Sequence, residues 1–347
     1  MAGGGVGGIE VLLNAFSRLS RHENIFCILW GKGEQIAESI KAQGNQVIEL
    51  EASHHRIIKP IRDVIDLCRR EHIDVIVAHH SAPLSHLILI EAKKRLPGIK
   101  TIAYAHSNIH DWALTGSLRN KIRYKIFQRS FTNADIVVAI SESVRDSVIE
   151  LFHVNPANIE VVYNGVSIDK YSSHESDTVK TKLELIYVGR LIEEKGVQNT
   201  VRGLKNYKAE YHLSIVGDGA YRSTLETLAE GMNVSFLGTR SDVPELLAKA
   251  DVFVHLPDCE EGFGITVIEA MAAGKICICG NRGAIPEIID NGIDGFLIQV
   301  DEFAQTLEMV AGLSEPEKNT IRNQARQKAA KFSIDSFAKK LDQIIGD

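Results

Sequence analysis

The 347-residue sequence has no apolar run close to the ~20 residues that a membrane-spanning helix needs. Its first residues, MAGGGVGG, lack the charged and apolar regions of a signal peptide, so a cytosolic protein is expected. The 5 cysteines are an odd number without CxxC spacing, which argues against a disulfide or zinc framework. The net charge of -6 argues against a nucleic-acid partner.

The sequence does contain β-branched runs that alternate with helical patterns, which is typical of an α/β fold with parallel sheets wrapped by helices. Residues 171–181, YSSHESDTVKT, are the best candidate linker. They divide the chain into domains at residues 1–170 and 171–330, with a C-terminal helix at 331–347 that is free to pack back on the first domain. The expected strands are 24–30, 46–52, 73–80, 100–107, 134–141, 159–166, 183–190, 211–219, 234–239, 251–256, 275–281 and 295–300.

Two cations follow one of these strands in VGRLIEEKG, residues 188–196. Arg190 comes directly after the strand, and Lys195 lies just before the next helical segment. Because parallel sheets bind ligands at the carboxyl ends of their strands and a helix N-terminus favours negative charge, this pair suits a diphosphate. The alternative is a surface ion pair of Arg190 with Glu193 or Glu194. A second glycine-containing segment, VGDG at residues 216–219, also ends an expected strand, but by itself it indicates only a turn.

The run EEGFGITVIEAMAAG, residues 260–274, carries two carboxylates of interest. Its apolar part predicts a buried helix with Thr266 and Glu269 as its only polar members, and a buried carboxylate needs a partner. Side chains on a helix lean toward its N-terminus, so Glu269 suits the two hydroxyls of a ribose bound there. Glu261 is placed to accept hydrogen bonds from a sugar beyond the phosphates. An internal ion pair of Glu269 with an arginine or lysine is the alternative.

These residues resemble the family 4 retaining glycosyltransferases of the GT-B fold. The segment from Glu261 to Glu269 is similar to their E-x7-E motif, and VGRLIEEKG is similar to VGRL-x-x-x-KG. VVYNGVSID, GTRSDVPELLAKADVFVHLP, PEII with NGIDGFLI, and FSIDSFAKKL also match, in the family's order, over nearly the whole chain. The resemblance implies two Rossmann-like domains that face each other across a cleft.

The resemblance implies that the protein is a retaining glycosyltransferase. It would move a sugar from a nucleotide-diphosphate sugar, carrying uridine or guanosine, to a glycan or lipid-linked saccharide in cell-surface polysaccharide synthesis. No cofactor and no metal are implied, and the absence of any Asp-x-Asp leaves a divalent ion without an obvious ligand set. Arg190 and Lys195 would take over its electrostatic role.

The resemblance also implies individual roles. Glu269 would hold the ribose, and Glu261 with the backbone at Phe263 and Gly264 would hold the donor sugar. The loop at Thr239 and Arg240 would lie against the base. The expected donor-binding set is Gly7, Gly8, Gly189, Arg190, Lys195, Arg240, Glu261, Gly262, Phe263, Gly264, Ile265 and Glu269. The expected catalytic residues are His106, Glu261, Arg190 and Lys195.

The first domain offers fewer signals. His106 lies just past a strand, where the family has a histidine near the donor sugar, and it is favoured over His110; His79 and His80, which end another strand, come next. The start departs from the family's pattern because only two residues precede the first glycine. The central first strand of the family is therefore missing or very short, and Gly7 with Gly8 are assigned to its glycine loop.

SLRNKIRYKIFQRSF, residues 117–131, carries five cations between Arg119 and Arg129. A basic amphipathic helix can lie on the anionic inner face of the plasma membrane, and ordinary helix packing with a solvated charged face is the alternative.

Two other enzyme classes compete with the transferase. A non-transferring nucleotide-sugar enzyme such as an epimerase would need no acceptor pocket. A nicotinamide-dependent oxidoreductase built on GGGVGG should have a strand before the glycines and an acidic residue closing the second strand. The run NIFCILW ends in tryptophan and GKG instead, which disfavours the oxidoreductase.

Overall fold

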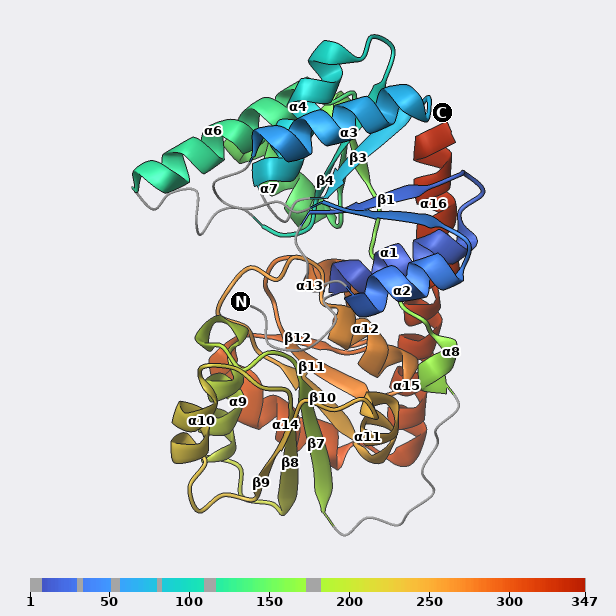
Figure 1. The fold of residues 1–347 in the computed structure, drawn as a ribbon. Coiled ribbons are helices and arrows are strands. Elements are labelled where there is room, and N and C mark those ends of the chain that lie inside the picture. The colour runs from blue at the N-terminus through green and yellow to red at the C-terminus, as the bar shows by residue number, and fades with distance from the viewer. Residues whose placement is uncertain are drawn as a thin grey trace. The chain divides into compact units, whose positions relative to one another are not determined.

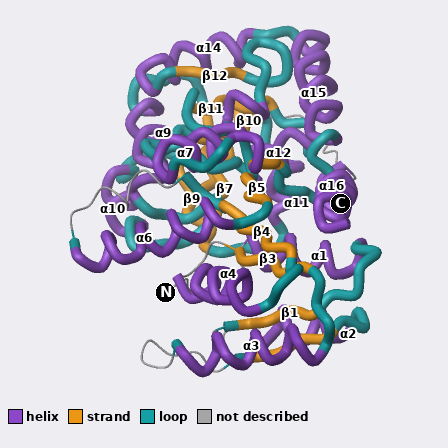
Figure 2. Tube along the Cα trace, turned by 90° about the horizontal axis from the view of Figure 1, so that it is seen from above, coloured by secondary structure: helices purple, strands orange, loops and turns teal. Residues whose placement is uncertain are grey.

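The computed structural model of the chain describes residues 8–29, 34–50, 57–79, 83–108, 117–172 and 182–346. The chain forms two compact units: Met1–Gly165 with Ile334–Asp347, and Val166–Ser333. We call them the first and the second unit. In Figures 1 and 2 the strands run through the middle of each unit and the helices lie around them. The sequence put the boundary at residue 170, whereas the chain enters the second unit at Val166.

The elements of the first unit alternate between strand and helix along most of its length. They are α1 (Gly8–Leu19), β1 (Ile25–Ile28), α2 (Glu34–Ala42), β2 (Gln46–Glu49), α3 (Ile58–Arg70), β3 (Val75–His79), α4 (Pro83–Arg95), β4 (Lys100–Ala105), α6 (Leu118–Asn133), β5 (Ile136–Ala139), α7 (Glu142–Phe152), the 3-10 turn η1 (Pro156–Asn158), β6 (Ile159–Val161) and α16 (Ile334–Gly346).

The described strands of the first unit form two separate parallel sheets, β1–β2 and β3–β4–β5–β6. Most residues of β4 and β5 are buried, as expected for parallel strands covered on both faces, whereas no residue of β1 or β2 is fully buried. Leu29 and Leu50, which follow β1 and β2, pack on the same apolar cluster as Ile76 of β3. The two sheets therefore share a core without sharing a hydrogen-bonded edge.

The last helix, α16, completes the first unit. Asp342 is only 4% exposed. Its Oδ1 accepts a hydrogen bond from Ser20 Oγ at 2.8 Å, and its Oδ2 accepts one from the backbone N–H of Arg21 at 3.0 Å. Phe337 contacts the ring of Phe16 edge-on, with 6.5 Å between centroids. Residues from the two ends of the chain thus form one core.

The second unit also alternates between strand and helix. Its elements are α8 (Asp169–Ser172), β7 (Leu183–Val188), η2 (Glu193–Lys195), α9 (Val197–Leu204), β8 (Tyr211–Val216), α10 (Arg222–Leu228), β9 (Val234–Gly238), α11 (Val243–Lys249), β10 (Val252–His255), α12 (Ile265–Ala272), β11 (Ile276–Gly280), α13 (Ile285–Ile288), β12 (Phe296–Ile298), η3 (Val300–Glu302), α14 (Phe303–Gly312) and α15 (Glu315–Ala330).

The described strands of the second unit form one parallel sheet in the order β12-β11-β10-β7-β8-β9. The chain builds outward from β7 through β8 to β9, then returns to the other side of β7 with β10 and continues outward again. The strand order therefore reverses between β7 and β10. In open parallel sheets, ligands bind outside the carboxyl ends of the strands at such a reversal.

Each of the twelve segments expected to be strands contains one, and the apolar run after Gly264 forms the buried helix α12. One expectation was wrong: Tyr171, assigned to a polar linker, belongs to α8 and is 9% exposed. Residues 173–181 of that stretch lie outside the described ranges.

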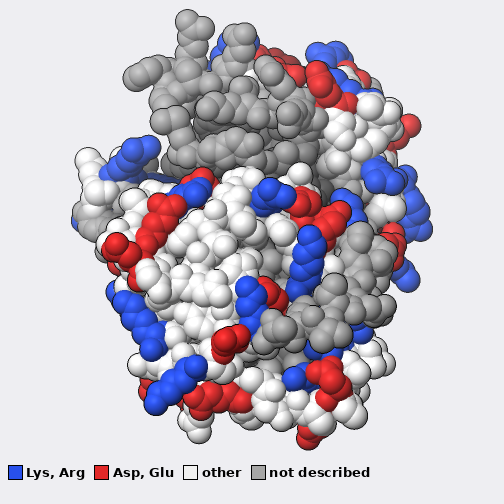
Figure 3. All heavy atoms as spheres, turned by 90° about the horizontal axis from the view of Figure 1, so that it is seen from below, with Lys and Arg blue, Asp and Glu red and all other residues white. Residues whose placement is uncertain are grey.

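Two surface properties bear on partners. Within the described ranges, no helix combines the length and apolar character that crossing a membrane requires. On the face drawn in Figure 3, Lys and Arg are interspersed with Asp and Glu around an uncharged area. The described part of this face is therefore neither uniformly positive nor uniformly negative.

Candidate functional site

The loops after β7 and β10, the two strands where the order reverses, lie against each other. Gly196 has φ +68°, and a Cβ there would stand 1.8 Å from the carbonyl oxygen of Leu256, so only glycine permits this approach. The backbone N–H of Asp258 donates to the carbonyl of Glu194 at 3.0 Å. Two segments about 60 residues apart in sequence are thereby held side by side, as expected of neighbouring parallel strands.

Side chains reinforce this contact. Asp258 accepts hydrogen bonds from the amides of Gln198 at 2.7 Å and Asn199 at 2.8 Å, which lie at the start of α9. On the other side, the N–H of Ala284 donates to the carbonyl of Glu261 at 2.8 Å. The loop that carries Glu261 is therefore held from two directions, which limits the movement of its carboxylate.

The sequence-predicted residues Lys195 and Glu261 meet at this place. Lys195 Nζ donates to Glu261 Oε2 at 2.7 Å, and the side chains are 19% and 13% exposed. His255 Nε2 lies 3.1 Å from the same oxygen. Burial alone would raise the pKa of Glu261, but the hydrogen bond from His255 and the charge of Lys195 outweigh it and lower the pKa to about 2. Glu261 is therefore ionised at neutral pH.

Sequence reasoning missed His255. It ends β10, is 3% exposed, and its ring Nδ1 has no hydrogen-bond partner among the described residues. A carboxylate can only accept, so Nε2 carries the proton toward Glu261. The signal available in the sequence was a histidine at the carboxyl end of an apolar strand, next to the motif that contains Glu261.

Arg190 follows β7 and is exposed. Among the described residues its guanidinium makes no hydrogen bond or ion pair, so the alternative of a pair with Glu193 or Glu194 is wrong. The loop is held instead through the backbone, because Tyr187 Oη donates to the carbonyl of Arg190 at 3.2 Å. Arg190 thus adds a positive charge, unpaired within the described ranges, to the same strand-to-helix loop that carries Lys195.

Helix α12 begins at the same edge. Gly264 is its N-cap with φ +99°, a left-handed conformation that favours glycine, and it supplies no side chain to the first N–H groups. These groups attract an anion. Ile265 is the first helical residue, and Glu269 lies one turn later on the helix.

Glu269 has a partner within the protein that the sequence did not suggest. Tyr171 Oη donates to Glu269 Oε1 at 2.6 Å. Among the described residues, no arginine or lysine forms an ion pair with Glu269, so the internal ion-pair alternative is wrong. Burial raises the pKa of Glu269, while the hydrogen bond from Tyr171 and the charge of Lys170 partly oppose that rise.

The other residues of the expected donor set are dispersed. Gly189 and Gly262 lie in the loops after β7 and β10, and Ile265 is the first residue of α12. Phe263 is 2% exposed and packs on Phe332, so only its backbone could face a ligand. Arg240 pairs with Asp242 through two hydrogen bonds of 2.6 and 2.7 Å. Gly8 begins α1, and Gly7 lies outside the described residues.

In the first unit, two of the candidate histidines are in contact. His79 Nδ1 lies 2.8 Å from His106 Nε2, and the Tyr104 ring is stacked on both imidazoles. Burial lowers the pKa of His79 to about 4, so this ring is neutral at physiological pH. His80 and His110 lie outside the described residues.

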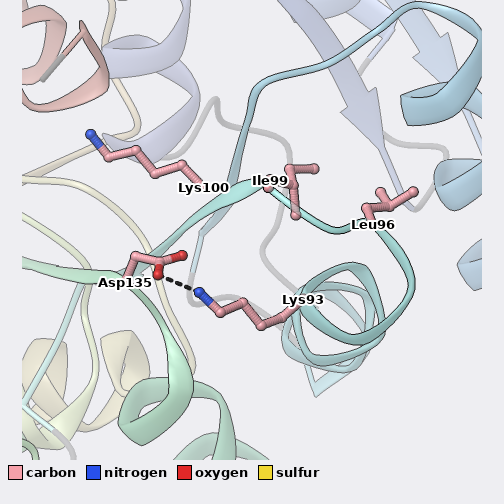
Figure 4. Close-up of a pocket in the computed structure, with 6 residues that line it drawn as sticks. Lys93, Leu96, Ile99, Lys100 and Asp135 are labelled. Carbon is pink, nitrogen blue, oxygen red and sulfur yellow. Dashed lines mark hydrogen bonds and ion pairs between the residues drawn. The ribbon is translucent and has the colours of Figure 1, made fainter.

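Two hollows lie away from these motifs. One, of about 370 Å³, is lined by Lys93, Leu96, Lys100 and Asp135 (Figure 4). Lys93 pairs with Asp135, and Lys100 donates to the carbonyl of Ile344 at 2.6 Å, so its charged groups are satisfied internally. The other, of about 800 Å³, lies at the starts of β7, β8, β10 and β11, opposite the carboxyl edge. Among the described residues, no three His, Cys, Asp or Glu side chains gather as a metal site.

Comparisons with known proteins agree with the architecture. Residues 2–170 match the family described as Glycosyltransferase Family 4, and residues 170–332 match Glycosyl transferases group 1. The N-acetyl-alpha-D-glucosaminyl L-malate synthase of Bacillus anthracis is 30% identical over 271 residues, which cover 73% of this chain and 68% of that protein. The UDP-Gal:alpha-D-GlcNAc-diphosphoundecaprenol alpha-1,3-galactosyltransferase of Escherichia coli is 26% identical over 318 residues, covering 83% and 79%.

Among solved structures, Anabaena HepE in complex with UDP superposes with a TM-score of 0.85 and 19% identity, covering 100% of this chain and 98% of that one. The fold is therefore GT-B, built from two Rossmann-like domains. The chain belongs to the family 4 glycosyltransferases, with a group 1 transferase domain in its second half.

Proposed function

We propose that the protein is a retaining, metal-independent glycosyltransferase whose donor is a nucleotide-diphosphate sugar, UDP-linked in preference to GDP-linked. The observation that supports this proposal most is the contact of Lys195 with Glu261 between the loops that follow the neighbouring strands β7 and β10, the first of which also carries the exposed Arg190. The uridine preference is supported by HepE, solved with UDP and with UDP-glucose, and by the UDP-galactose named for the E. coli relative.

In the proposed reaction, the bond between the anomeric carbon and the diphosphate oxygen breaks, and the diphosphate leaves with the electron pair. Arg190 and Lys195 stabilise the charge that develops on it. A diphosphate oxygen takes the proton of the acceptor hydroxyl, and the new glycosidic bond forms on the face that the leaving group occupied. Glu261 would bind the sugar, Glu269 the ribose and Arg240 the side of the base, and His106 is a further candidate for a catalytic role.

The two glutamates provide the test. Glu269→Gln should weaken binding of UDP alone by about 1 to 3 kcal/mol, because a charge-assisted acceptor for the ribose is lost. Glu261→Gln should leave UDP binding nearly unchanged and reduce sugar transfer. Calorimetry with UDP and with intact sugar nucleotide would measure both, and proton NMR of the product would report its anomeric configuration. Equal losses for both ligands in both variants would overturn the division of roles.

The proposed acceptor is a lipid-linked saccharide at the inner face of the plasma membrane, as used in cell-surface polysaccharide synthesis. Helix α6 supports a membrane contact. Leu118 and Ile122 are 75% and 54% exposed, at a spacing that puts them on one face. No acidic residue occurs in α6, and none of Arg119, Lys121, Lys125 and Arg129 forms an ion pair among the described residues. In Figure 1 the start of α6 extends past the other helices of its unit.

Vesicle sedimentation tests this contact. Binding to vesicles with 30% anionic lipid is expected to exceed binding to zwitterionic vesicles and to fall with salt. Replacing Lys121 and Lys125 by Gln should weaken it by roughly 1 kcal/mol per charge. The control Lys59→Gln removes an exposed lysine already paired with Asp63 and should have no effect. Equal binding by all three proteins would exclude α6 as the membrane surface.

A further inference from the structure

The contact between Tyr171 and Glu269 joins two distant parts of the sequence. Tyr171 lies in α8, six residues after the chain leaves the first unit, and α8 packs on α11 and α12. The phenol is buried, and its Oη donates to Glu269 Oε1 at 2.6 Å. A buried phenol that makes its bond to a carboxylate is held in one orientation, because no water competes for it.

This bond uses only part of the carboxylate. An ionised carboxylate offers two oxygens and about four lone-pair sites. Tyr171 occupies one site on Oε1, and no described residue hydrogen-bonds to Oε2. The terminal torsion of a glutamate is broad, so a glutamate without an internal partner would sample many orientations. With Oε1 held, the orientation of the whole carboxylate is restricted, so Oε2 can accept hydrogen bonds with little further ordering.

We propose that Tyr171 is a positioning residue that orients Glu269 and thereby sets the selectivity of the site for ribonucleotides over 2′-deoxyribonucleotides. This inference rests on the proposed function, in which Glu269 binds the ribose. A vicinal diol needs two acceptor positions at a fixed separation, whereas a single hydroxyl tolerates many carboxylate orientations. Loss of the Tyr171 hydrogen bond therefore weakens binding of the diol more than binding of the 2′-deoxy sugar.

The test uses Tyr171→Phe, which removes one oxygen and keeps the ring. Calorimetry would give dissociation constants for UDP and 2′-deoxyuridine diphosphate, with the guanosine pair measured in parallel. We expect wild type to favour UDP by about tenfold, and the variant to favour it by less than about threefold, with binding of the deoxynucleotide changed little. Tyr207→Phe is the matched control, because Tyr207 is also buried in the second unit but lines the hollow at the opposite edge of the sheet.

Two further variants separate the possible failures. Glu269→Gln should also lose the preference for UDP, and adding Tyr171→Phe to it should cause no further loss, because both act through one carboxylate. A preference lost in Glu269→Gln but kept in Tyr171→Phe would refute the role of Tyr171 and leave the ribose assignment intact. A preference kept in both would refute the ribose assignment itself. Equal weakening toward both nucleotides in Tyr171→Phe would indicate a purely structural contact and would also refute the inference.

Discussion

Replacing Lys195 by Met removes the ammonium group that contacts Glu261 while keeping most of the volume of the side chain. Under the proposed mechanism, this cation stabilises the leaving diphosphate. Losing one such group costs about 2 to 4 kcal/mol in the barrier, which is roughly a 30- to 1,000-fold lower transfer rate. The same change leaves Glu261 with His255 as its remaining partner at 3.1 Å.

The stability cost is expected to be smaller. Breaking a fully buried pair costs about 3 to 5 kcal/mol, but both side chains keep some exposure and His255 still donates to the carboxylate, so about 1 to 2 kcal/mol is expected. The folded-state pKa of Glu261, about 2, lies below its unfolded value. Its ionisation therefore adds stability that is present in full above about pH 4.3 and is lost as the pH falls through 2.

The assay combines transfer kinetics with urea unfolding between pH 5 and 8. Glu261 of the wild type is ionised throughout this window, so its contact with Lys195 is present at every pH tested, and the stability difference from Lys195→Met should persist across the window. Lys205→Met, at an exposed position in the same unit, is the control and should match wild type. Transfer rates within threefold of wild type in folded Lys195→Met would refute the role of this cation, and a stability difference that disappeared between pH 5 and 8 would show that another group carries it.

Three further outcomes are expected. Arg190→Gln should lower the transfer rate by at least 30-fold, because a cation at the leaving diphosphate is lost. The melting temperature should not change, because the guanidinium has no internal partner among the described residues. A changed melting temperature with an unchanged transfer rate would contradict both expectations. Transfer should persist in excess EDTA, and complete loss restored by Mg²⁺ would contradict the proposal that two cations serve in place of a metal. Asp342→Ala should lower the free energy of unfolding by about 1 to 3 kcal/mol, because it leaves the Ser20 hydroxyl and the Arg21 N–H without their acceptor; urea titration would measure this, and a loss below 0.5 kcal/mol would contradict it.

The sequence predicted the strands and α12 well because their patterns are local: β-branched runs form strands, and an apolar run after Gly264 forms a helix. It also led to the prediction that Lys195 and Glu261 bind the same ligand, because both follow strands of a parallel sheet. It could not predict that the two side chains touch, since this depends on β7 and β10 being neighbours and on the close approach at Gly196.

Local sequence patterns could not predict contacts between residues that lie far apart in the chain. Tyr171 stands among polar residues, and nothing in its neighbourhood indicates that its hydroxyl meets a carboxylate 98 residues later. The division of the first unit's strands into two sheets was likewise not expected. Hydrophobic alternation predicts that a strand exists, whereas pairing is decided by which neighbour supplies the complementary edge.

The inclusion of α16 in the first unit has a consequence for synthesis on the ribosome. Residues 1–165 emerge first, but the helix that supplies Asp342 and Phe337 emerges only after the whole second unit. At about 5 to 20 residues per second, the first unit waits on the order of 10 to 30 s with the α16-facing side of α1 uncovered. The second unit, continuous from Val166 to Ser333, can finish folding in that interval, so the unit that is made first is the last to be completed.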